Sequence, residues 1–261
     1  MITTTLQIEL NGNEHSPAEL RSYVLDGNRT RPAVVICPGG GYHFLSPREA
    51  EAIALQFAAA GFHAFILYYT VKPDYYRQPL LELSQAVCTI RDKATEWNLD
   101  PERIAVCGFS AGGHLAASLG VHWDKLKDSP NNKPNALILS YPVITSGEFK
   151  HAGSILNLLG PDPTEEELQE MSLEKQVSTS TPPTFLWHTV ADPVVPVENS
   201  LMFATALRQQ DIPFELHIYP NGPHGLSLAT EETDDGRGTD EHVATWMGLC
   251  IQWLKSLFQF A

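Results

Sequence analysis

The chain has few basic residues and no hydrophobic run long enough to cross a bilayer. Only 17 lysines and arginines stand against 31 aspartates and glutamates, which gives a formal net charge of −14. Phosphate backbones and anionic membrane surfaces repel such a chain, so we expect neither nucleic acid nor a membrane as a partner. The first residues also lack the basic and then apolar pattern of a signal peptide.

Cysteine is scarce too, with four residues in 261 and no CxxC pair. The four, Cys37, Cys88, Cys107 and Cys250, each stand beside apolar neighbours. We interpret them as reduced packing residues and expect a cytoplasmic protein. Clustered side chains with the spacing of metal ligands are lacking as well, so we expect no metal site.

What the chain does contain is an alternation of short β-rich runs with longer segments of helical periodicity. Strands are predicted at 6–10, 21–26, 33–37, 62–69, 103–109, 136–143, 184–190 and 213–219. Helices are predicted at 46–61, 80–97, 111–122, 197–210 and 242–258. Because this alternation is typical of parallel strand pairs, we expect one α/β domain over residues 1–261. It should have a mostly parallel sheet of about eight strands with helices on both faces.

Two segments interrupt the alternation. Residues 144–183 contain a short predicted helix at 164–176, and we interpret this segment as a small cap inserted over the site. A surface excursion that does not touch substrate is the alternative. The acidic, glycine-containing stretch at 231–241 is interpreted as a solvated loop before the last helix.

A serine stands at one strand-to-helix junction in the pattern Gly108-x-Ser110-x-Gly112. Small residues two positions before and after the serine allow the sharp turn that projects its hydroxyl outward. The N–H of Ala111, at the helix start, could stabilise a nearby negative charge. By itself the pattern also fits a serine that only caps the helix.

A serine nucleophile needs a base and a group that orients the base, in the chain order Ser, Asp or Glu, His. Asp192 directly follows the strand predicted at 184–190, and His224 directly follows the one at 213–219. Both therefore lie at the carboxyl ends of strands, where active sites of open α/β sheets form. Asp192 could alternatively cap the next helix, and His188 and His217, within strands, are interpreted as core residues.

The run CPGGGYHF at 37–44 follows the third predicted strand. Its three glycines let the backbone approach a ligand closely and point N–H groups at it. A nucleotide site is disfavoured, because neither G-x-G-x-x-G nor a P-loop lysine is present. Tyr42 and His43, next to the glycines, are candidates for lining the substrate pocket, with structural roles as the alternative.

Together GFSAGGHLAASL, CPGGGY, ADPVVPVENS and GPHGLS resemble the α/β-hydrolase superfamily. More narrowly they resemble its group of bacterial acetylesterases, acetyl-xylan-esterase-like proteins and BD-FAE-type enzymes, from about Arg21 to Leu257. Pro38 stands where the hormone-sensitive-lipase-like branch has histidine, which favours the sugar-ester esterases.

The resemblance implies Ser110 as nucleophile, His224 as general base and acid, and Asp192 as its orienting partner. It also implies an oxyanion hole from the N–H groups of Gly40, Gly41 and Ala111.

The activity implied is that of a serine carboxylesterase for short acyl groups, such as O-acetyl groups on sugars or xylo-oligosaccharides. Such an enzyme needs no cofactor. Its partner would be a small-molecule ester, and a homodimer is one expected assembly. The alternatives are an arylformamidase-like amidase, a small serine peptidase and a non-catalytic binding protein.

Overall fold

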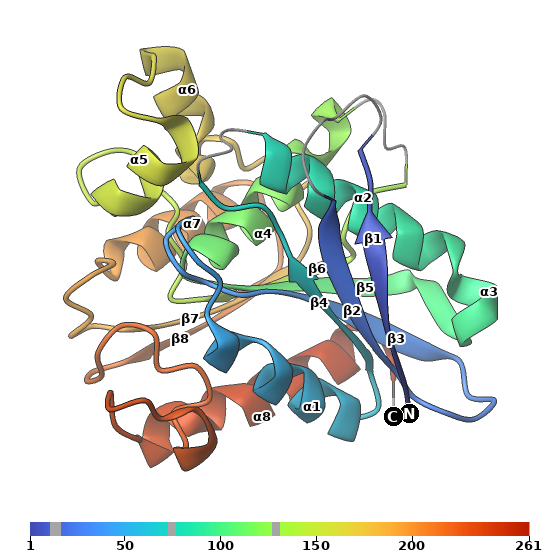
Figure 1. Ribbon diagram of the computed structural model, residues 1–261. Coiled ribbons are helices and arrows are strands. Elements are labelled where there is room, and N and C mark those ends of the chain that lie inside the picture. Colours follow the sequence, from blue (N-terminus) through green and yellow to red (C-terminus); the bar gives the residue numbers. More distant parts are fainter. Residues whose placement is uncertain (11–16, 73–76, 127–130, 261) are drawn as a thin grey trace.

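The computed structural model describes residues 1–10, 17–72, 77–126 and 131–260. The described residues form one eight-stranded sheet in the order β1-β2-β4-β3-β5-β6-β7-β8 (Figure 1). The strands are β1 (Ile2–Ile8), β2 (Ala18–Val24), β3 (Arg31–Cys37), β4 (His63–Tyr68), β5 (Leu99–Phe109), β6 (Ala136–Ser140), β7 (Thr184–Thr189) and β8 (Phe214–Tyr219). Pairing is antiparallel from β1 through β2 to β4 and parallel from β4 to β8. The expected mostly parallel sheet is confirmed.

Helices cover both faces of this sheet. They are α1 (Glu51–Ala59), α2 (Gln78–Asp92), α3 (Ala94–Trp97), α4 (Ala111–His122), α5 (Ala152–Leu159), α6 (Glu165–Glu170), α7 (Glu198–Gln209) and α8 (Glu241–Leu257). In Figure 1, α1 and α8 lie on one face, and α2, α4 and α7 lie on the other. Each face has its own buried apolar cluster. On the central strand β3, Val34 belongs to the cluster under α1 and α8, and Val35 belongs to the other.

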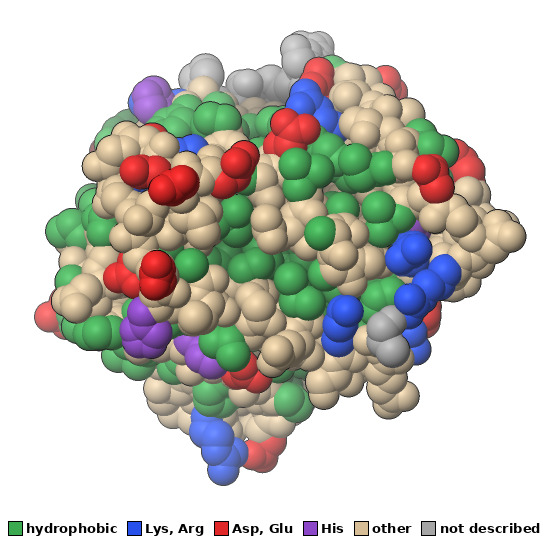
Figure 2. Space-filling model, turned by 90° about the horizontal axis from the view of Figure 1, so that it is seen from below, with side chains coloured by type: hydrophobic (Ala, Val, Ile, Leu, Met, Phe, Trp, Pro, Cys, Tyr) green, Lys and Arg blue, Asp and Glu red, His purple; other side chains and the backbone are tan. Residues whose placement is uncertain are grey.

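The surface nearest α1 and α8 is mixed in character. Seen from below in Figure 2, hydrophobic side chains lie among polar and acidic ones, and lysine and arginine gather toward one side. Leu55 of α1 and Leu257 of α8 are among the exposed apolar residues. Scattered apolar side chains are ordinary on a protein surface. Within the described ranges, no helix combines the length and the apolar character needed to span a bilayer.

Several boundaries differ from the predicted ones. β1 begins at Ile2 because the threonine-rich start of the chain pairs with β2. β5 begins at Leu99, earlier than the predicted 103, because Leu99 pairs with Arg31 at the start of β3. β6 ends at Ser140 because Tyr141 takes a positive φ of 37°. The segment between the strands predicted at 6–10 and 21–26 lies largely outside the described residues.

The 144–183 segment contains α5, α6 and a 3-10 turn at Leu173–Lys175. Helix α5 was not predicted, whereas α6 lies within the predicted 164–176 helix. The capping box at Thr164 and Glu167 defines the start of α6. Met171 and Leu173 anchor the segment, since both are buried in the cluster on the α2, α4 and α7 face.

Gly112 and Gly248 offer a matched test of close packing between β3 and α4. A Cβ on Gly112 would lie 2.5 Å from the Pro38 carbonyl oxygen and nearer still to that of Cys37, whereas one on Gly248 would meet nothing within 4 Å. We expect Gly112→Ala to lower the free energy of unfolding by about 1–3 kcal/mol or more, because the backbone of Cys37 and Pro38 must move to make room for the methyl group. Gly248→Ala should raise it by up to ~1 kcal/mol through helix propensity. Urea denaturation of both variants tests this, and an equal effect would contradict it.

Candidate active site

Ser110 occupies the sharp turn between β5 and α4. Its backbone has φ 53° and ψ −116°, a conformation that side chains other than glycine rarely adopt. The turn is tight, since a Cβ on Gly108 would overlap the backbone of Gly112 and one on Gly113 would lie 2.8 Å from Pro142. A Cβ on Gly108 or on Gly112 would collide with neighbouring backbone, so both glycine positions of the G-x-S-x-G pattern exclude a side chain.

The structure brings Ser110, His224 and Asp192 together. Nε2 of His224 lies 2.8 Å from the Ser110 hydroxyl, which donates to it while the ring is neutral. The other ring nitrogen, Nδ1, donates to Oδ2 of Asp192 at 2.6 Å. Asp192 follows β7 and His224 follows β8, so both lie at the carboxyl ends of strands, as expected from the sequence. This is the geometry of a nucleophile, a base and an orienting carboxylate.

The carboxylate of Asp192 has hydrogen-bond partners besides His224. Its Oδ1 accepts from the backbone N–H groups of Val194 at 2.8 Å and Val195 at 3.0 Å. Nε2 of the buried His188 lies 3.4 Å from Oδ2. Burial acts to raise the pKa of Asp192, but the hydrogen bonds from His188 and His224 outweigh it and hold that pKa well below its ordinary value. The carboxylate therefore stays charged and keeps His224 in one orientation.

The glycine loop after β3 presents free backbone donors beside Ser110. The N–H of Gly39 is engaged, since it donates to Oε2 of Glu49 at 2.8 Å. Among the described residues, no acceptor pairs with the N–H groups of Gly40, Gly41 or Ala111. These are the three N–H groups that the sequence resemblance names as candidate oxyanion donors.

A buried carboxylate, which the sequence reasoning missed, joins the glycine loop to the histidine loop. Glu49 is 3% exposed, and its Oε1 accepts from the Tyr141 hydroxyl at 2.6 Å. That hydroxyl accepts in turn from the backbone N–H of Ser227 at 3.0 Å. The Tyr141 ring also packs edge-on against His224, with centroids 5.1 Å apart. Glu49 and Tyr141 are thus positioning residues for the two loops that meet at Ser110.

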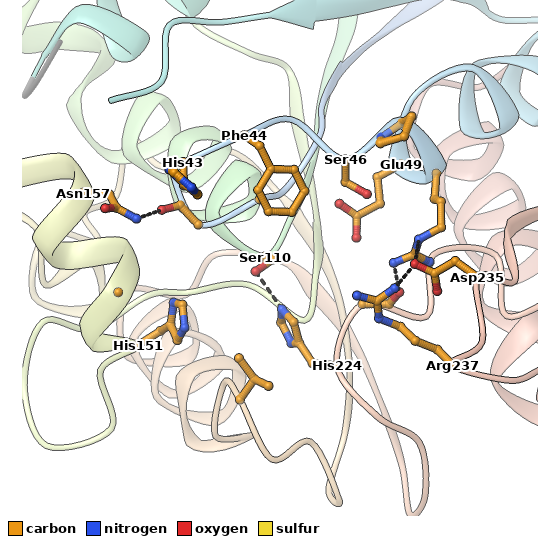
Figure 3. Close-up of a pocket in the computed structure, with 17 residues that line it drawn as sticks. His43, Phe44, Ser46, Glu49, Ser110, His151, Asn157, His224, Asp235 and Arg237 are labelled. Carbon is orange, nitrogen blue, oxygen red and sulfur yellow. Dashed lines mark hydrogen bonds and ion pairs between the residues drawn. The ribbon is translucent and has the colours of Figure 1, made fainter. Parts of the chain in front are cut away.

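A pocket of about 520 Å³ opens over Ser110. Figure 3 shows His151 and Asn157 of the cap segment on one side of Ser110, and Asp235 and Arg237 on the other. The pocket lining also includes His43, Phe44, Arg48, Glu49, Gly153, Val194 and His224. His43 and part of the 144–183 segment therefore line this pocket.

The 231–241 segment is more than a solvated loop. Arg48 donates to the Gly225 carbonyl oxygen at 2.8 Å and pairs with Asp235 at 3.0 Å. Asp235 also pairs with Arg237, and both line the pocket. The sequence offered no local signal for the contacts of Arg48, because Gly225 and Asp235 lie far from it in the chain.

Tyr42 corrects one expectation, since it does not line this pocket. Its φ of 56° turns the side chain inward, where it is 3% exposed and donates to Nδ1 of His114 at 3.0 Å. The opposite nitrogen of His114 donates to the carbonyl oxygen of Met171 at 3.1 Å. Tyr42 and His114 thus link the glycine loop to the cap from beneath.

The role of Glu49 is testable against Glu51, which also accepts from a tyrosine hydroxyl, that of Tyr23, but at the surface. Glu49→Gln leaves one buried donor without an acceptor, so we expect the free energy of unfolding to fall by about 1–3 kcal/mol. Glu51→Gln should stay within ~0.5 kcal/mol of the parent. Chemical denaturation measures both, and equal losses would contradict the assignment.

His114 predicts a pH dependence of stability. Burial lowers its pKa from 6.5 to about 4. Between these values the unfolded chain binds more protons than the folded one, so the contribution of His114 to stability falls as the pH falls. From pH 7 to pH 5 we expect the parent to lose about 2 kcal/mol more unfolding free energy than His114→Gln. Urea titrations at the two pH values measure this, and parallel losses would contradict it.

Comparison with known proteins places this geometry in a family. The sequence profile named BD-FAE matches residues 23–207, a range that includes Ser110 and Asp192 and ends before His224. The chain belongs to the BD-FAE family. The solved acetyl ester-xyloside bifunctional hydrolase of Caldicellulosiruptor lactoaceticus is 39% identical with a TM-score of 0.90, over 99% of this chain and 97% of that one. The expected α/β-hydrolase fold is confirmed.

Two curated relatives are similar over most of this chain. The endo-1,4-β-xylanase B of Butyrivibrio fibrisolvens is 43% identical over 85% of this chain and 37% of its own length. The acetylxylan esterase of Xylanibacter ruminicola is 31% identical over 87% of this chain and 47% of its own length. This BD-FAE chain therefore spans less than half of either relative.

Proposed function

We propose that this chain is a serine carboxylesterase that hydrolyses short acyl esters, chiefly O-acetyl esters of sugars or xylo-oligosaccharides. The observation that carries the proposal is the chain of hydrogen bonds from Ser110 to His224 at 2.8 Å and on to Asp192 at 2.6 Å. The free N–H groups of the glycine loop stand beside it.

In the first half-reaction, Oγ of Ser110 attacks the ester carbonyl carbon while Nε2 of His224 takes the hydroxyl proton. The oxyanion that forms is stabilised by the N–H groups of Gly40, Gly41 and Ala111. Collapse of the tetrahedral intermediate breaks the ester bond, and His224 passes its proton to the leaving alcohol.

In the second half-reaction, water attacks the acyl-serine while His224 removes its proton. The acid is released and the Ser110 hydroxyl is restored. Asp192 remains ionised and stabilises the imidazolium in both steps. Every step uses side chains and backbone groups of this chain.

A sugar ester fits the pocket in size and character. Its volume of about 520 Å³ is in the range of small-molecule sites. Phe44 is 55% exposed and lines the pocket, so its ring is available to pack against the apolar face of a sugar. The names of the relatives, acetylxylan esterase and acetyl ester-xyloside hydrolase, also support acetylated xylosides.

Cleavage of a glycosidic bond fits the site less well, although one relative is named a xylanase. Glycosidases need one protonated carboxyl group and one free carboxylate across the scissile bond. The described pocket carboxylates are Glu49 and Asp235. Glu49 accepts from Gly39 and Tyr141, and Asp235 pairs with Arg48 and Arg237. Both carboxylates are therefore engaged by protein groups, and neither is free to act as the acid or the base of a glycosidase.

Location and assembly remain proposals as well. Among the described residues, Cys37, Cys107 and Cys250 are buried and form no disulfide bond, which supports a reducing, cytoplasmic location. A homodimer is proposed only because dimers are common among such enzymes.

The proposed reaction predicts distinct effects of two variants on hydrolysis of p-nitrophenyl acetate and of acetylated xylosides. Ser110→Ala should reduce kcat to background, because the acyl-enzyme cannot form. Asp192→Asn should lower kcat by about 10³–10⁴-fold with little change in KM, because His224 loses its orienting acceptor. Steady-state kinetics measures both.

An active Ser110→Ala protein would refute the mechanism. Faster turnover of N-formylkynurenine or prolyl peptides than of acetyl esters would instead favour an amidase or a peptidase. Failure of a fluorophosphonate probe to label the parent would favour a binding protein.

A further inference from the structure

His151 stands at the start of the cap helix α5 and is one of the residues lining the pocket over Ser110. Figure 3 shows its ring on the cap side of the pocket, near His224. A Cβ built on Gly41 would lie 3.9 Å from Cε1 of His151, so the ring also lies close to the glycine loop. The imidazole thus stands between the base and the glycine loop.

The hydrogen bonds of His151 determine which ring nitrogen carries the proton. The backbone N–H of Ser154 donates to Nδ1 at 3.2 Å, and the Ser154 hydroxyl lies 2.8 Å from the same atom. A backbone N–H can only donate, so Nδ1 is the acceptor and, in the neutral ring, Nε2 bears the hydrogen. Within the described chain, no hydrogen-bond partner is found for Nε2.

The cap segment holds this ring at a fixed place relative to the catalytic groups. Asn157, on the same short helix, donates from Nδ2 to the carbonyl oxygen of Gly41 at 2.8 Å. Burial, and then the neighbouring His224, lower the pKa of His151, so the ring is neutral at neutral pH. His151 therefore presents one neutral N–H donor to the pocket.

We propose that His151 binds the alcohol half of the substrate, donating from Nε2 to a hydroxyl oxygen next to the scissile ester. This proposal rests on the proposed esterase function and narrows its substrate to alcohols that carry such a hydroxyl, as a partly acetylated sugar does. The leaving oxygen must lie within reach of Nε2 of His224, because that atom protonates it. A ring beside His224 consequently faces the alcohol half rather than the far end of the acyl chain.

His151 is a specificity residue in this account and takes no part in proton transfer. His224 already contacts both Ser110 and Asp192. The Nδ1 of His151 is occupied by Ser154 instead of a carboxylate, so nothing prepares this ring to act as a base.

Two variants distinguish the two roles of His151, as a hydrogen-bond donor to the pocket and as the N-cap of α5. Asparagine is a favourable N-cap residue, so His151→Asn keeps an acceptor for the Ser154 N–H but lacks a group that reaches the pocket. His151→Ala removes both. The substrates are a methyl xyloside with one acetyl group and a free neighbouring hydroxyl, and p-nitrophenyl acetate, which has no hydroxyl.

With both variants, we expect KM for the acetylated xyloside to rise about three- to tenfold, the loss of one neutral hydrogen bond. The kcat for that substrate and both constants for p-nitrophenyl acetate should change less than about twofold, because the catalytic groups are untouched. Equal effects on the two substrates, or none on the xyloside, would overturn the proposal. A rise in KM seen only in His151→Ala would also overturn it, because the effect would then come from the lost N-cap of α5.

A third substrate tests which half of the ester His151 contacts. If the ratio of p-nitrophenyl butyrate to acetate turnover changes in His151→Asn, the ring contacts the acyl group and the assignment to the alcohol half is wrong. Failure of the esterase function itself is distinguishable, because it would appear as activity retained in Ser110→Ala with every substrate.

Discussion

The active site depends on close contact between the end of β3 and the first turn of α4. Gly112 lies so near the carbonyl oxygens of Cys37 and Pro38 that no Cβ fits between them. The contact brings the glycine loop beside the strained turn at Ser110, so the free N–H groups and the Ser110 hydroxyl meet at one point. Acyl transfer requires this, because the oxyanion forms on the same carbonyl carbon that the serine oxygen attacks.

Buried polar groups then fix the remaining loops around that contact. Glu49 and Tyr141 connect the N–H of Gly39 to that of Ser227, three residues beyond His224. A carboxylate without these partners would be costly to bury, so the two loops and the carboxylate stabilise one another. On the cap side, Asn157 holds the carbonyl oxygen of Gly41. The precision of the site thus comes from hydrogen bonds between segments distant in sequence.

Features with a local cause could be predicted from the sequence. The alternating strands and helices indicated the sheet, and the positions of Ser110, Asp192 and His224 after strands predicted that they would meet. Features that depend on tertiary contacts could not. Glu49 sits beside the start of α1 with nothing local to show its partner Tyr141, 92 residues away. The inward turn of Tyr42 follows from a positive φ. Helix α5, with eight residues, is too short for its periodicity to stand out.

The central claim is that Ser110 carries the acyl group during the reaction. Rapid mixing of the protein with an acetyl ester, acid quench and peptide mass spectrometry tests it most directly. The account predicts a peptide containing Ser110 that is heavier by one acetyl group, formed in the first turnover and then lost by hydrolysis. An acetyl group on another residue, or turnover without any acetylated peptide, would contradict it.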